Sequence, residues 1–365
     1  MKYLYDYRQF RNTAHLFFIF LLLCPVPANS QSRPVCSYCG KSIPGTIISA
    51  GKSFFHPEHF LCAYCGKIIS GGYNEKDDKF YHPDCYKQNE GLTCAYCGKL
   101  LEDEYIVSTG KKYHPECYEK NVLPKCSVCS LPLKDKFSVD IYGNKYHPAH
   151  SAELSKCDCC KRLICQNLTR GGKRYSDGRN ICMLCFLESV SEQYQINEMF
   201  KKVISKLNSF GININGKNIK AIGVDRIELK KRSSSFSDNT QGFCDSETKS
   251  NFLNDKLVSK LYNHTIYILN GTHYLSMEAT LAHELMHAWM TENCSEKLPD
   301  KIKEGSCNYI SYLYLNSLSN SKKNDFIKLI ENDPDPVYGK GFKEIKFGFE
   351  NKSLTQLLAY LKAKN

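Results

Sequence analysis

The chain has 365 residues, of which 42% are hydrophobic and 24% are charged. That length allows two or three domains, and that composition excludes a wholly disordered chain. The net charge of +11 is not gathered in a dense basic run, so we interpret it as a solvated surface and expect no nucleic-acid partner. The unusual feature is the 20 cysteines, most of which fall in one half of the chain.

The first thirty residues predict a targeting segment. A positively charged start, with Lys2, Arg8 and Arg11, precedes the apolar run Leu16–Cys24. That run is shorter than the roughly 20 residues that a membrane-spanning helix needs. Ala28 and Ser30 then supply small residues at the −3 and −1 positions of a cleavage site. We expect a signal peptide over residues 1–30, a secreted or periplasmic mature chain, and no membrane span after cleavage.

Paired cysteines and histidines repeat between residues 36 and 185. Two residues separate the members of every pair, and two pairs on tight knuckles can surround one Zn²⁺ with four tetrahedral ligands. Glycine follows the first pair in three cases and permits a left-handed turn there. The five quartets are Cys36, Cys39, His56 and His59; Cys62, Cys65, His82 and Cys85; Cys94, Cys97, His114 and Cys117; Cys126, Cys129, His147 and His150; and Cys157, Cys160, Cys182 and Cys185.

A disulfide framework is the alternative that export would normally favour. Six histidines occupy positions where cystines would need cysteines, so we predict about five structural zinc ions instead. Such small fingers bury little apolar surface, and metal binding would supply their folding free energy. Cys159 and Cys165 are surplus beside the fifth quartet, and Cys159 could replace Cys157 or Cys160 as a ligand.

Only Phe60-Leu61 joins the first two quartets, and this spacing resembles the tandem fingers of a LIM domain. His59 and His82 stand where cysteine is commoner in that domain, and both can still bind zinc. The other three quartets are more widely spaced and are LIM-like. We expect a LIM domain over residues 31–88 and LIM-like fingers over residues 89–186. They would bind a protein partner or pack on a neighbouring domain.

The second half of the chain mixes helix and strand signals. We predict helices over Glu192–Phe210 and Ile302–Leu318, strands over Ile219–Leu229 and within Leu261–Tyr274, and a polar loop over Ser233–Asn251. Gly211 should end the first of these helices, and Asn270-Gly271 should form a turn after the last strand. One of the strands should lie at a sheet edge and hold an extended peptide.

The segment Ala279–Met290 contains the pattern HExxH, formed by His283, Glu284 and His287. Positions i and i+4 share one face of a helix, so the two imidazoles can bind one Zn²⁺ while the carboxylate takes a proton from a metal-bound water. The alternative is an amphipathic helix with two incidental histidines. The absence of Gly and Pro, the preceding strand and a following acidic residue favour the catalytic zinc.

A catalytic zinc needs a third protein ligand. The acidic candidates downstream are Glu292, Glu296, Asp300 and Glu304. We predict Glu304, because it begins a new helix that can fold back antiparallel and sixteen residues separate it from His287. Asn308 could orient a ligating histidine, although a surface or helix-packing role is commoner for asparagine.

Other residues have a structural interpretation beside the functional one. Tyr338, in a Gly/Pro-rich loop, is a candidate for oxyanion stabilisation, although packing is the commoner role of a tyrosine. Trp289 should lie in the core, and His264 and His273 should be surface or strand-end residues rather than ligands. Cys244 and Cys307 could be buried small hydrophobic residues.

Five stretches of the second half resemble the peptidase domain of the ubiquitin-activated LIM-domain zinc peptidases, which regulate organ size in plants. They are Gly242–Glu247, Ile266–Asn270, Ala282–Trp289, Glu304–Cys307 and Asp335–Phe342. Asp177-Gly178-Arg179 matches the same family, and the resemblance runs from about residue 36. It implies an α+β, gluzincin-like zincin domain over residues 187–365, with His283, His287 and Glu304 as zinc ligands and Glu284 as the base.

The plant proteins carry ubiquitin-interacting helices before the LIM domain, where this chain has the expected signal peptide. Ubiquitin activation and the plant substrates therefore do not carry over, and the chain resembles a bacterial-type exported relative. We expect a zinc metallopeptidase that acts on a protein or peptide, with LIM-type fingers that recruit or position a protein partner. The alternatives are a LIM-type interaction scaffold with an inactive peptidase-like domain and a nucleic-acid-binding zinc-finger protein.

Overall fold

The computed structural model describes residues 9–11, 33–101, 104–233, 236–253 and 256–364. The expected signal peptide lies outside these residues except for a three-residue strand, β1 (Gln9–Arg11), which pairs with β6 (Glu104–Ser108). Within the described part of the chain, no helix has the length and apolar character needed to cross a membrane. The chain forms two compact units, residues 1–124 with 132–136 and residues 125–131 with 137–365.

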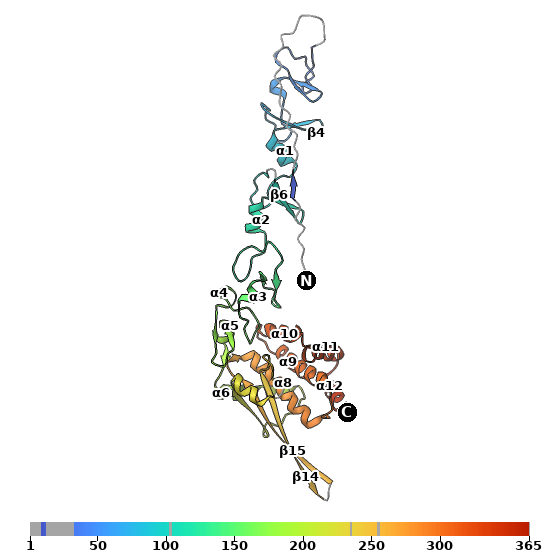
Figure 1. Cartoon of the computed structure of the whole chain (residues 1–365). Helices are drawn as coiled ribbons and strands as arrows, with labels where there is room; N and C mark the ends of the chain where they lie inside the picture. The colour runs from blue at the N-terminus through green and yellow to red at the C-terminus, as the bar shows by residue number, and fades with distance from the viewer. Residues whose placement is uncertain (1–8, 12–32, 102–103, 234–235, 254–255, 365) are drawn as a thin grey trace. The chain divides into compact units, whose positions relative to one another are not determined.

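The first unit contains three small fingers, each built from a β-hairpin followed by a short helix (Figure 1). The hairpins are β2 (Ile48–Ala50) with β3 (Ser53–Phe55), β4 (Asn74–Lys76) with β5 (Lys79–Tyr81), and β6 with β7 (Lys111–Tyr113). The helices are η1 (Pro57–His59), α1 (Pro83–Asn89) and α2 (Pro115–Asn121). Each helix begins at a proline, whose fixed φ and missing N–H suit that position.

The glycines after the first pairs take the expected left-handed turn, with φ of 71° at Gly40, 70° at Gly66 and 71° at Gly98. The last two fingers adopt the same turn at Ser130 and Lys161, both with φ of 64°. An L-residue with a side chain is costly in this conformation, which indicates that the surrounding knuckle fixes the turn.

Phe60, in the two-residue linker of the LIM-type pair, is fully buried and joins the first two fingers. Its ring centroid lies 5.4 Å from that of Phe55 in the first finger. It also lies 5.3 Å from both Tyr73 and Phe80 in the second finger. Aromatic pairs at these separations stabilise a core beyond the area that they bury. The short linker therefore gives the two fingers one shared core.

The second unit begins with the fourth and fifth fingers. Their elements are β8 (Ser138–Val139), β9 (Lys145–Tyr146), α3 (His150–Glu153), α4 (Gln166–Thr169), β10 (Gly172–Arg174), β11 (Asn180–Cys182) and α5 (Met183–Phe186). Cys157 and Cys182 share a buried cluster with Leu275 and Phe326 from the C-terminal helices. The compact unit therefore includes these fingers, whereas the domain boundary that we expected from sequence lies at residue 187.

The C-terminal part is an α+β arrangement around a three-stranded sheet with the order β13-β15-β14. The strand β13 (Ile219–Val224) runs parallel to β15 (Lys256–Leu269), and β14 (Gly242–Leu253) runs antiparallel to it. A two-stranded ladder joins β12 (Ser189–Val190) to β16 (Thr272–His273). The helices are α6 (Gln193–Ser209), α7 (Arg226–Arg232), α8 (Tyr274–Asn293), α9 (Asp300–Asn316), α10 (Lys323–Glu331), α11 (Tyr338–Phe349) and α12 (Leu354–Ala363).

The side chains of β15 point alternately to the two faces of the sheet and pack in two different apolar clusters. Ile266 and Ile268 join the main core, which contains apolar residues of α6, α8 and α9, whereas Leu269 packs with Leu229 of α7. Helix α8 is buried on several sides because it lies between this sheet and α9. Within the HExxH pattern Glu284 is therefore buried, whereas His283 and His287 are partly exposed along one side of the helix.

The structure confirms some expected elements and corrects others. The Glu192–Phe210 helix exists as α6, and Gly211 follows it with a φ of 89°. The expected loop over Ser233–Asn251 was wrong, because much of it belongs to β14. Most of that strand is exposed, so no core required apolar residues and its pattern resembled a loop.

The strand expected over Ile219–Leu229 is too long. The strand β13 stops at Val224, where the side chain of Asp225 accepts a hydrogen bond from the backbone N–H of Glu228 and starts α7. An aspartate at this position satisfies a free N–H of the first helical turn. The alternation of apolar residues continued across this N-cap and concealed it.

Helices α9 and α11 approach each other through two glycines. A β-carbon added at Gly305 would lie 2.3 Å from the carbonyl carbon of Gly341, and one added at Gly341 would lie 2.3 Å from the carbonyl oxygen of Lys301. These distances are far below van der Waals contact, and backbone atoms cannot move aside as a flexible side chain can. The two glycines therefore set the position of α9 and, with it, that of Glu304.

We predict that Gly305→Ala lowers the free energy of unfolding by about 2–3 kcal/mol, because the methyl group overpacks the helix contact. Chemical denaturation of the two proteins would measure the difference. The matched control is Gly348→Ala in α11, where an added β-carbon meets nothing within 4 Å. The control should be unchanged or up to about 1 kcal/mol more stable. Equal stability of the Gly305→Ala variant and the wild type would contradict the packing argument.

Candidate functional site

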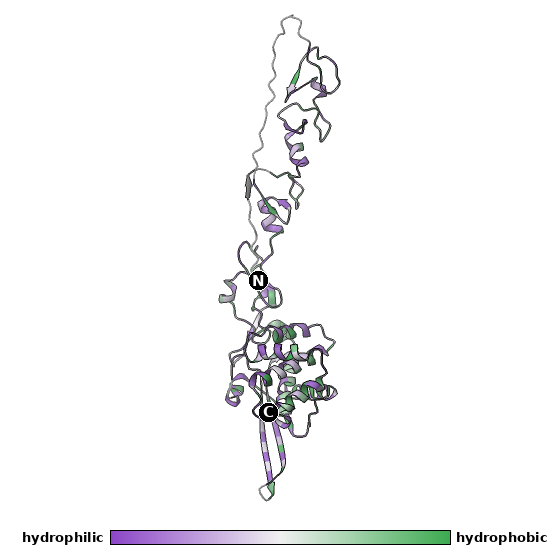
Figure 2. Cartoon of the chain, turned by 90° about the vertical axis from the view of Figure 1, so that its right-hand side faces the viewer, coloured by the Kyte–Doolittle hydropathy of each residue, from purple (hydrophilic) through white to green (hydrophobic). Residues whose placement is uncertain are grey.

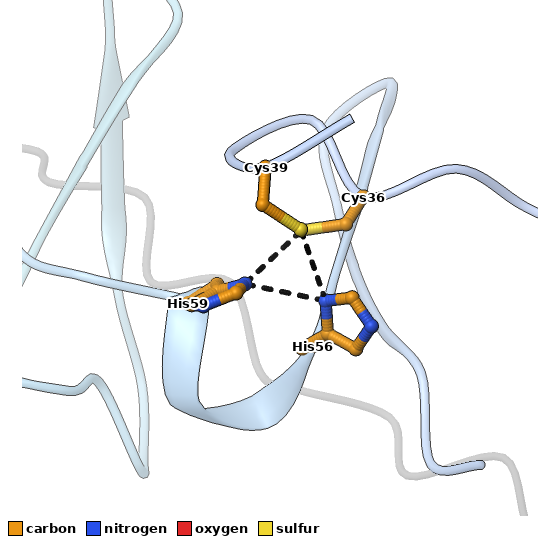
Figure 3. A group of neighbouring side chains, drawn as sticks. All are labelled: Cys36, Cys39, His56 and His59. Carbon is orange, nitrogen blue, oxygen red and sulfur yellow. Dashed lines mark hydrogen bonds between the residues drawn. The ribbon is translucent and has the colours of Figure 1, made fainter. Parts of the chain in front are cut away.

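The structure brings the ligand atoms of each cysteine and histidine quartet within 4.8 Å of one another. Bonds of about 2.0 Å to nitrogen and 2.3 Å to sulfur around a tetrahedral zinc imply separations of about 3.3 Å between nitrogens, about 3.5 Å between N and S, and about 3.8 Å between sulfurs. In the first quartet, the Nδ1 atoms of His56 and His59 lie 3.2 Å apart, and Cys36 Sγ lies 3.6 Å from His59 Nδ1. In the fifth quartet, the sulfurs of Cys160 and Cys182 lie 3.7 Å apart. These separations match a shared zinc ion, and Figure 3 shows the first quartet converging.

In each of the first four quartets, the thiol of the first cysteine has a lowered pKa, which favours metal binding. Burial raises the pKa of these thiols, but backbone N–H groups of the knuckle lower it more strongly. The net effect lowers the pKa of Cys36 to about 5 and that of Cys62, Cys94 and Cys126 to about 6. The thiolate is the form that binds zinc, so these sites favour the metal chemically as well as geometrically.

The fifth quartet consists of four buried cysteines, Cys157, Cys160, Cys182 and Cys185. The two surplus cysteines have other positions. Cys159 is buried in the adjoining apolar cluster, and the sulfur of Cys165 accepts a hydrogen bond from the N–H of Leu168 at the start of α4. The sulfurs of Cys157, Cys160, Cys182 and Cys185 converge, with Cys159 buried beside them in the same cluster.

A different set of ligand atoms meets on α8 and α9. The Nε2 atoms of His283 and His287 lie 3.1 Å apart, and Glu304 Oε2 lies 3.1 Å from the first and 3.3 Å from the second. Three atoms at these separations match three ligands of one tetrahedral zinc, for which about 3.3 Å is expected. Burial raises the pKa of Glu304, but hydrogen bonds from the two histidines lower it well below its usual range.

The other acidic candidates do not join this set. Glu292 Oε1 lies 3.1 Å from His264 Nε2, on a different side of the last turns of α8. Asp300 is exposed in the first turn of α9. Glu296 lines the neighbouring cavity, and among the described residues no contact links it to the two histidines. Of the four acidic candidates, the structure therefore places Glu304 beside the HExxH histidines.

Asn308 lies where it can orient the ring of His283, which is one of the two roles that we considered for it. Its Oδ1 lies 3.0 Å from Nδ1 of His283, the ring nitrogen opposite Nε2. An acceptor there keeps the proton on Nδ1 and leaves Nε2 free to bind a metal. The Nδ2 group of Asn308 donates to the backbone oxygen of Tyr338 at 3.4 Å, which links α9 to α11.

Glu284 is buried against the edge of the sheet. A β-carbon added at Gly242 would lie 2.8 Å from Glu284 Oε1, so only glycine leaves room for this carboxylate. Burial raises its pKa to about 7, with a further rise from Glu304, while His283 and the backbone N–H of Cys244 oppose the shift. A carboxyl group with a pKa near neutrality can both accept and return a proton.

Tyr338 is the first residue of α11, not part of a loop as expected. Asp335 explains the difference, because its Oδ1 accepts hydrogen bonds from the N–H groups of Val337 and Tyr338 and thereby starts the helix. The Tyr338 ring stacks at 6.2 Å from the ring of His283. Burial raises the pKa of its phenol well above the usual value, so the hydroxyl stays protonated.

The remaining predictions give mixed results. Trp289 lies in the core as expected, and Cys307 is fully buried. Both side chains are buried, so neither His264 nor His273 is a surface residue; His273 does end the strand β16, as the strand-end alternative expected, whereas His264 lies within β15. His273 accepts the N–H of Leu275 at the start of α8, and His264 lies between Ser246 and Glu292. Only tertiary contacts reveal these roles.

A cavity of about 820 Å³ lies over these residues. Its wall combines the start of β14, the exposed stripe of α8, the first turns of α9 and the start of α11. Gly242, Cys244 and Ser246 contribute from the strand, and Tyr338 contributes from α11. The start of β14 and the three residues His283, Glu284 and His287 therefore line one cavity.

The fifth finger holds the turn that precedes α8. The buried Arg179 forms an ion pair with Asp177 at 2.8 Å and donates to the backbone oxygen of Asn270 at 2.7 Å. The hydroxyl of Tyr175 donates to the backbone oxygen of Gly271 at 3.1 Å. The residues that position the HExxH helix thus come partly from a finger that is distant in the sequence.

Two regions of the chain match known families. Residues 36–90 match the LIM domain, and residues 226–327 match the DA1-like family, described as Protein DA1. The chain is 23% identical to Protein DA1 of Arabidopsis thaliana over 273 residues, which are 60% of this chain and 50% of that protein. It is 25% identical to LIM domain-containing protein HDR3 of Oryza sativa subsp. japonica over 201 residues, 48% of this chain and 40% of that one.

The chain is therefore a protein with an N-terminal LIM zinc-finger region and a C-terminal DA1-like domain of mixed helix and strand. It is homologous to the plant DA1 proteins, which also include Protein DA1-related 2 of Arabidopsis thaliana, 27% identical over 203 residues. That match covers 48% of this chain and 38% of the relative, so the chain spans half or less of the length of these curated relatives. The LIM match contains the first two quartets, and the DA1-like match contains His283, His287 and Glu304.

We predict about six zinc ions per chain, five in the quartets and one at His283, His287 and Glu304. Elemental analysis of the purified protein would count them. The double variant His283→Ala/His287→Ala should hold about five, because the quartets do not involve these residues. A zinc content near zero together with paired cystines would contradict the assignment of all five quartets.

Proposed function

We propose that this chain is a zinc-dependent peptidase. The observation that carries the proposal is the convergence of His283 Nε2, His287 Nε2 and Glu304 Oε2 within 3.3 Å, in a cavity that also holds the buried carboxylate of Glu284. Three protein ligands beside an accessible cavity are the arrangement of a catalytic zinc, whereas four closed ligands are that of a structural one. The resemblance to the plant LIM-domain zinc peptidases supports the same residues.

Bound zinc would polarise a substrate carbonyl and acidify a water molecule. Glu284 would accept one proton as the oxygen of that water bonds to the carbonyl carbon, and would then give it to the amide nitrogen as the C–N bond breaks. Its location between α8 and Gly242 keeps it desolvated, which explains a basicity suited to both transfers. Asn308 would hold the ring of His283 in the required tautomer, and the protonated Tyr338 would donate to a developing oxyanion.

The start of β14 would hold the substrate chain. Leu269 donates its N–H to the carbonyl of Gln241 at 2.8 Å, so alternate residues from Gln241 onward bond to β15. Gly242 and Cys244 lie between those residues, so their backbone groups face away from β15, where the N–H of Cys244 donates to the Glu284 carboxylate. An extended peptide would pair with the remaining groups of this edge as an added strand, which would align its peptide bond over the metal ligands.

The LIM region would recruit a protein partner, as LIM domains generally mediate protein interactions. Three tyrosines support this role, each placed just before the second cysteine of a first pair. Tyr38, Tyr64 and Tyr96 are 62%, 51% and 56% exposed. Exposed tyrosines are favourable contact residues because a large, rigid ring loses little conformational entropy on binding.

We further propose export, on the composition of residues 1–30. Chain recovered outside the producing cells should begin near Gln31, because the expected cleavage site follows Ser30. N-terminal sequencing of that material would test this prediction. An intact Met1 on the recovered chain would contradict cleavage at this site.

For the peptidase itself, we predict that Glu284→Gln lowers kcat on a peptide substrate by at least about 100-fold, because glutamine cannot accept the proton. The zinc content should remain that of the wild type, since Glu284 is not among the predicted ligands. Peptide cleavage assays with metal analysis of the same samples would measure both quantities.

The control is Glu296→Gln, which changes the same type of residue in the same cavity without a role in the chemistry. It should keep wild-type activity within about twofold. A protein that binds zinc normally but cleaves no peptide in wild-type form would favour the alternative, a LIM-type interaction scaffold with an inactive peptidase-like domain.

A further inference from the structure

The two outer edges of the sheet differ. On β13, the side chain of Gln193 covers the edge, because its Nε2 donates to the carbonyl of Ala221 at 2.9 Å and its Oε1 accepts from the N–H of Gly223 at 3.0 Å. A strand edge satisfied in this way cannot pair with another chain. The opposite edge belongs to β14. There the Glu284 carboxylate accepts from the N–H of Cys244, and among the described residues no group outside the sheet bonds to the outward N–H groups from Ser246 to Ser250.

The free groups of β14 continue well beyond the cavity. The register that leaves Gly242 and Cys244 facing outward also directs the backbone groups of Ser246, Thr248 and Ser250 outward. Among the residues that the structure describes, no group outside the sheet bonds to these three N–H groups. The edge therefore has a row of unpaired donors and acceptors that begins at Ser246, one outward position beyond the Cys244 N–H that Glu284 engages.

The outer part of β14 and β15 forms a two-stranded arm, residues 247–253 and 256–263. It extends away from the helices, as Figures 1 and 2 show, because β13 pairs with β15 only from His264 to Leu269. Figure 2 shows mostly hydrophilic residues along its length. The tip is different, since Phe252, Leu253 and Val258 are each more than 60% exposed. A two-stranded ribbon has little stability in water on its own, and a third strand would stabilise it.

The base of the arm is fixed to the helix that carries the metal ligands. Ser246 Oγ lies 2.8 Å from His264 Nδ1, and His264 Nε2 lies 3.1 Å from Glu292 Oε1. These contacts join β14, β15 and the last turns of α8. A peptide strand aligned on the arm would therefore be held in a defined register relative to His283 and His287.

We propose that the outer edge of β14 binds an extended, unfolded segment of the substrate protein as an antiparallel third strand that leads into the cavity. The proposal rests on the proposed function and adds the part of the substrate that the enzyme recognises. Because β14 runs outward from Gly242 to Leu253, an antiparallel segment has its N-terminal end at the tip. The bound segment thus precedes the scissile bond, and it carries apolar residues opposite Phe252 and Leu253.

The test uses proline at positions whose N–H faces outward. Thr248→Pro/Ser250→Pro removes two donors from the free edge and leaves the hydrogen bonds between β14 and β15 in place. The matched control, Thr248→Ala/Ser250→Ala, changes the same side chains and keeps both N–H groups. Circular dichroism and zinc content would verify that both full-length variants fold.

The first measurement is binding of fluorescein-labelled β-casein, an unfolded protein, to full chains that all carry Glu284→Gln. We expect the proline variant to bind at least about tenfold more weakly than the alanine control, from the loss of two hydrogen bonds. Equal affinities of the two variants would overturn the proposal. Because this readout needs no turnover, it can succeed even if the chain proves not to be a peptidase.

The second measurement is cleavage by chains with Glu284 intact. Two fluorogenic peptides would copy the sequence around the casein bond that is cleaved first. One would have about two residues before the scissile bond and the other about ten, so that the longer one reaches the tip at about 3.3 Å per residue. The proline pair should lower kcat/KM about tenfold for the long peptide and leave the short one unchanged. Equal losses on both peptides, or a loss confined to peptides extended after the scissile bond, would overturn the proposal. Cleavage of casein without any effect of proline would reject the arm and retain the peptidase.

Discussion

The buried ion pair of Arg179 and Asp177 is the interaction on which the candidate site depends. Through Arg179 the fifth finger holds the carbonyl of Asn270, and the turn at Asn270 leads through the two-residue strand β16 into α8. Removing one member of a buried ion pair leaves an uncompensated charge that costs about 3–5 kcal/mol. The fifth quartet supports the segment that carries Asp177 and Arg179, because its ligand Cys182 lies three residues after Arg179. A structural metal site and the HExxH helix are therefore parts of one folded unit, not independent modules.

The chain presents zinc-type ligands in two ways, and the backbone explains the difference. In the quartets, two knuckles surround one point from both sides, so all four positions around a metal are filled by the protein. On α8, His283 and His287 project from consecutive turns of one helix and can approach a metal only from one side. Glu304 adds a third ligand from α9, and the remaining side faces the cavity. Closed sites suit folding, whereas an open site suits exchange of water and substrate.

How much the sequence could predict depends on whether the signal was local. The quartets, α8 and the choice of Glu304 were accessible, because spacing along one knuckle or helix decides which atoms can meet. The strand β14 was missed because its exposed ribbon has no apolar alternation, and Tyr338 was misplaced because the Asp335 cap was overlooked. The burial of His264 depends on Ser246 and Glu292, which are 18 and 28 residues away. Only the fold brings such residues together.

The unequal edges of the sheet indicate which surface the fold keeps available. An unprotected strand edge favours aggregation, and proteins commonly cover or interrupt it. Here Gln193 covers β13, while β14 keeps its outward groups free for most of its length. Glycine at position 242, where any side chain would meet Glu284, shows that the same strand is fitted closely to the HExxH helix. An edge that is open, long and packed against the candidate catalytic carboxylate is best explained by pairing with a chain that the site acts upon.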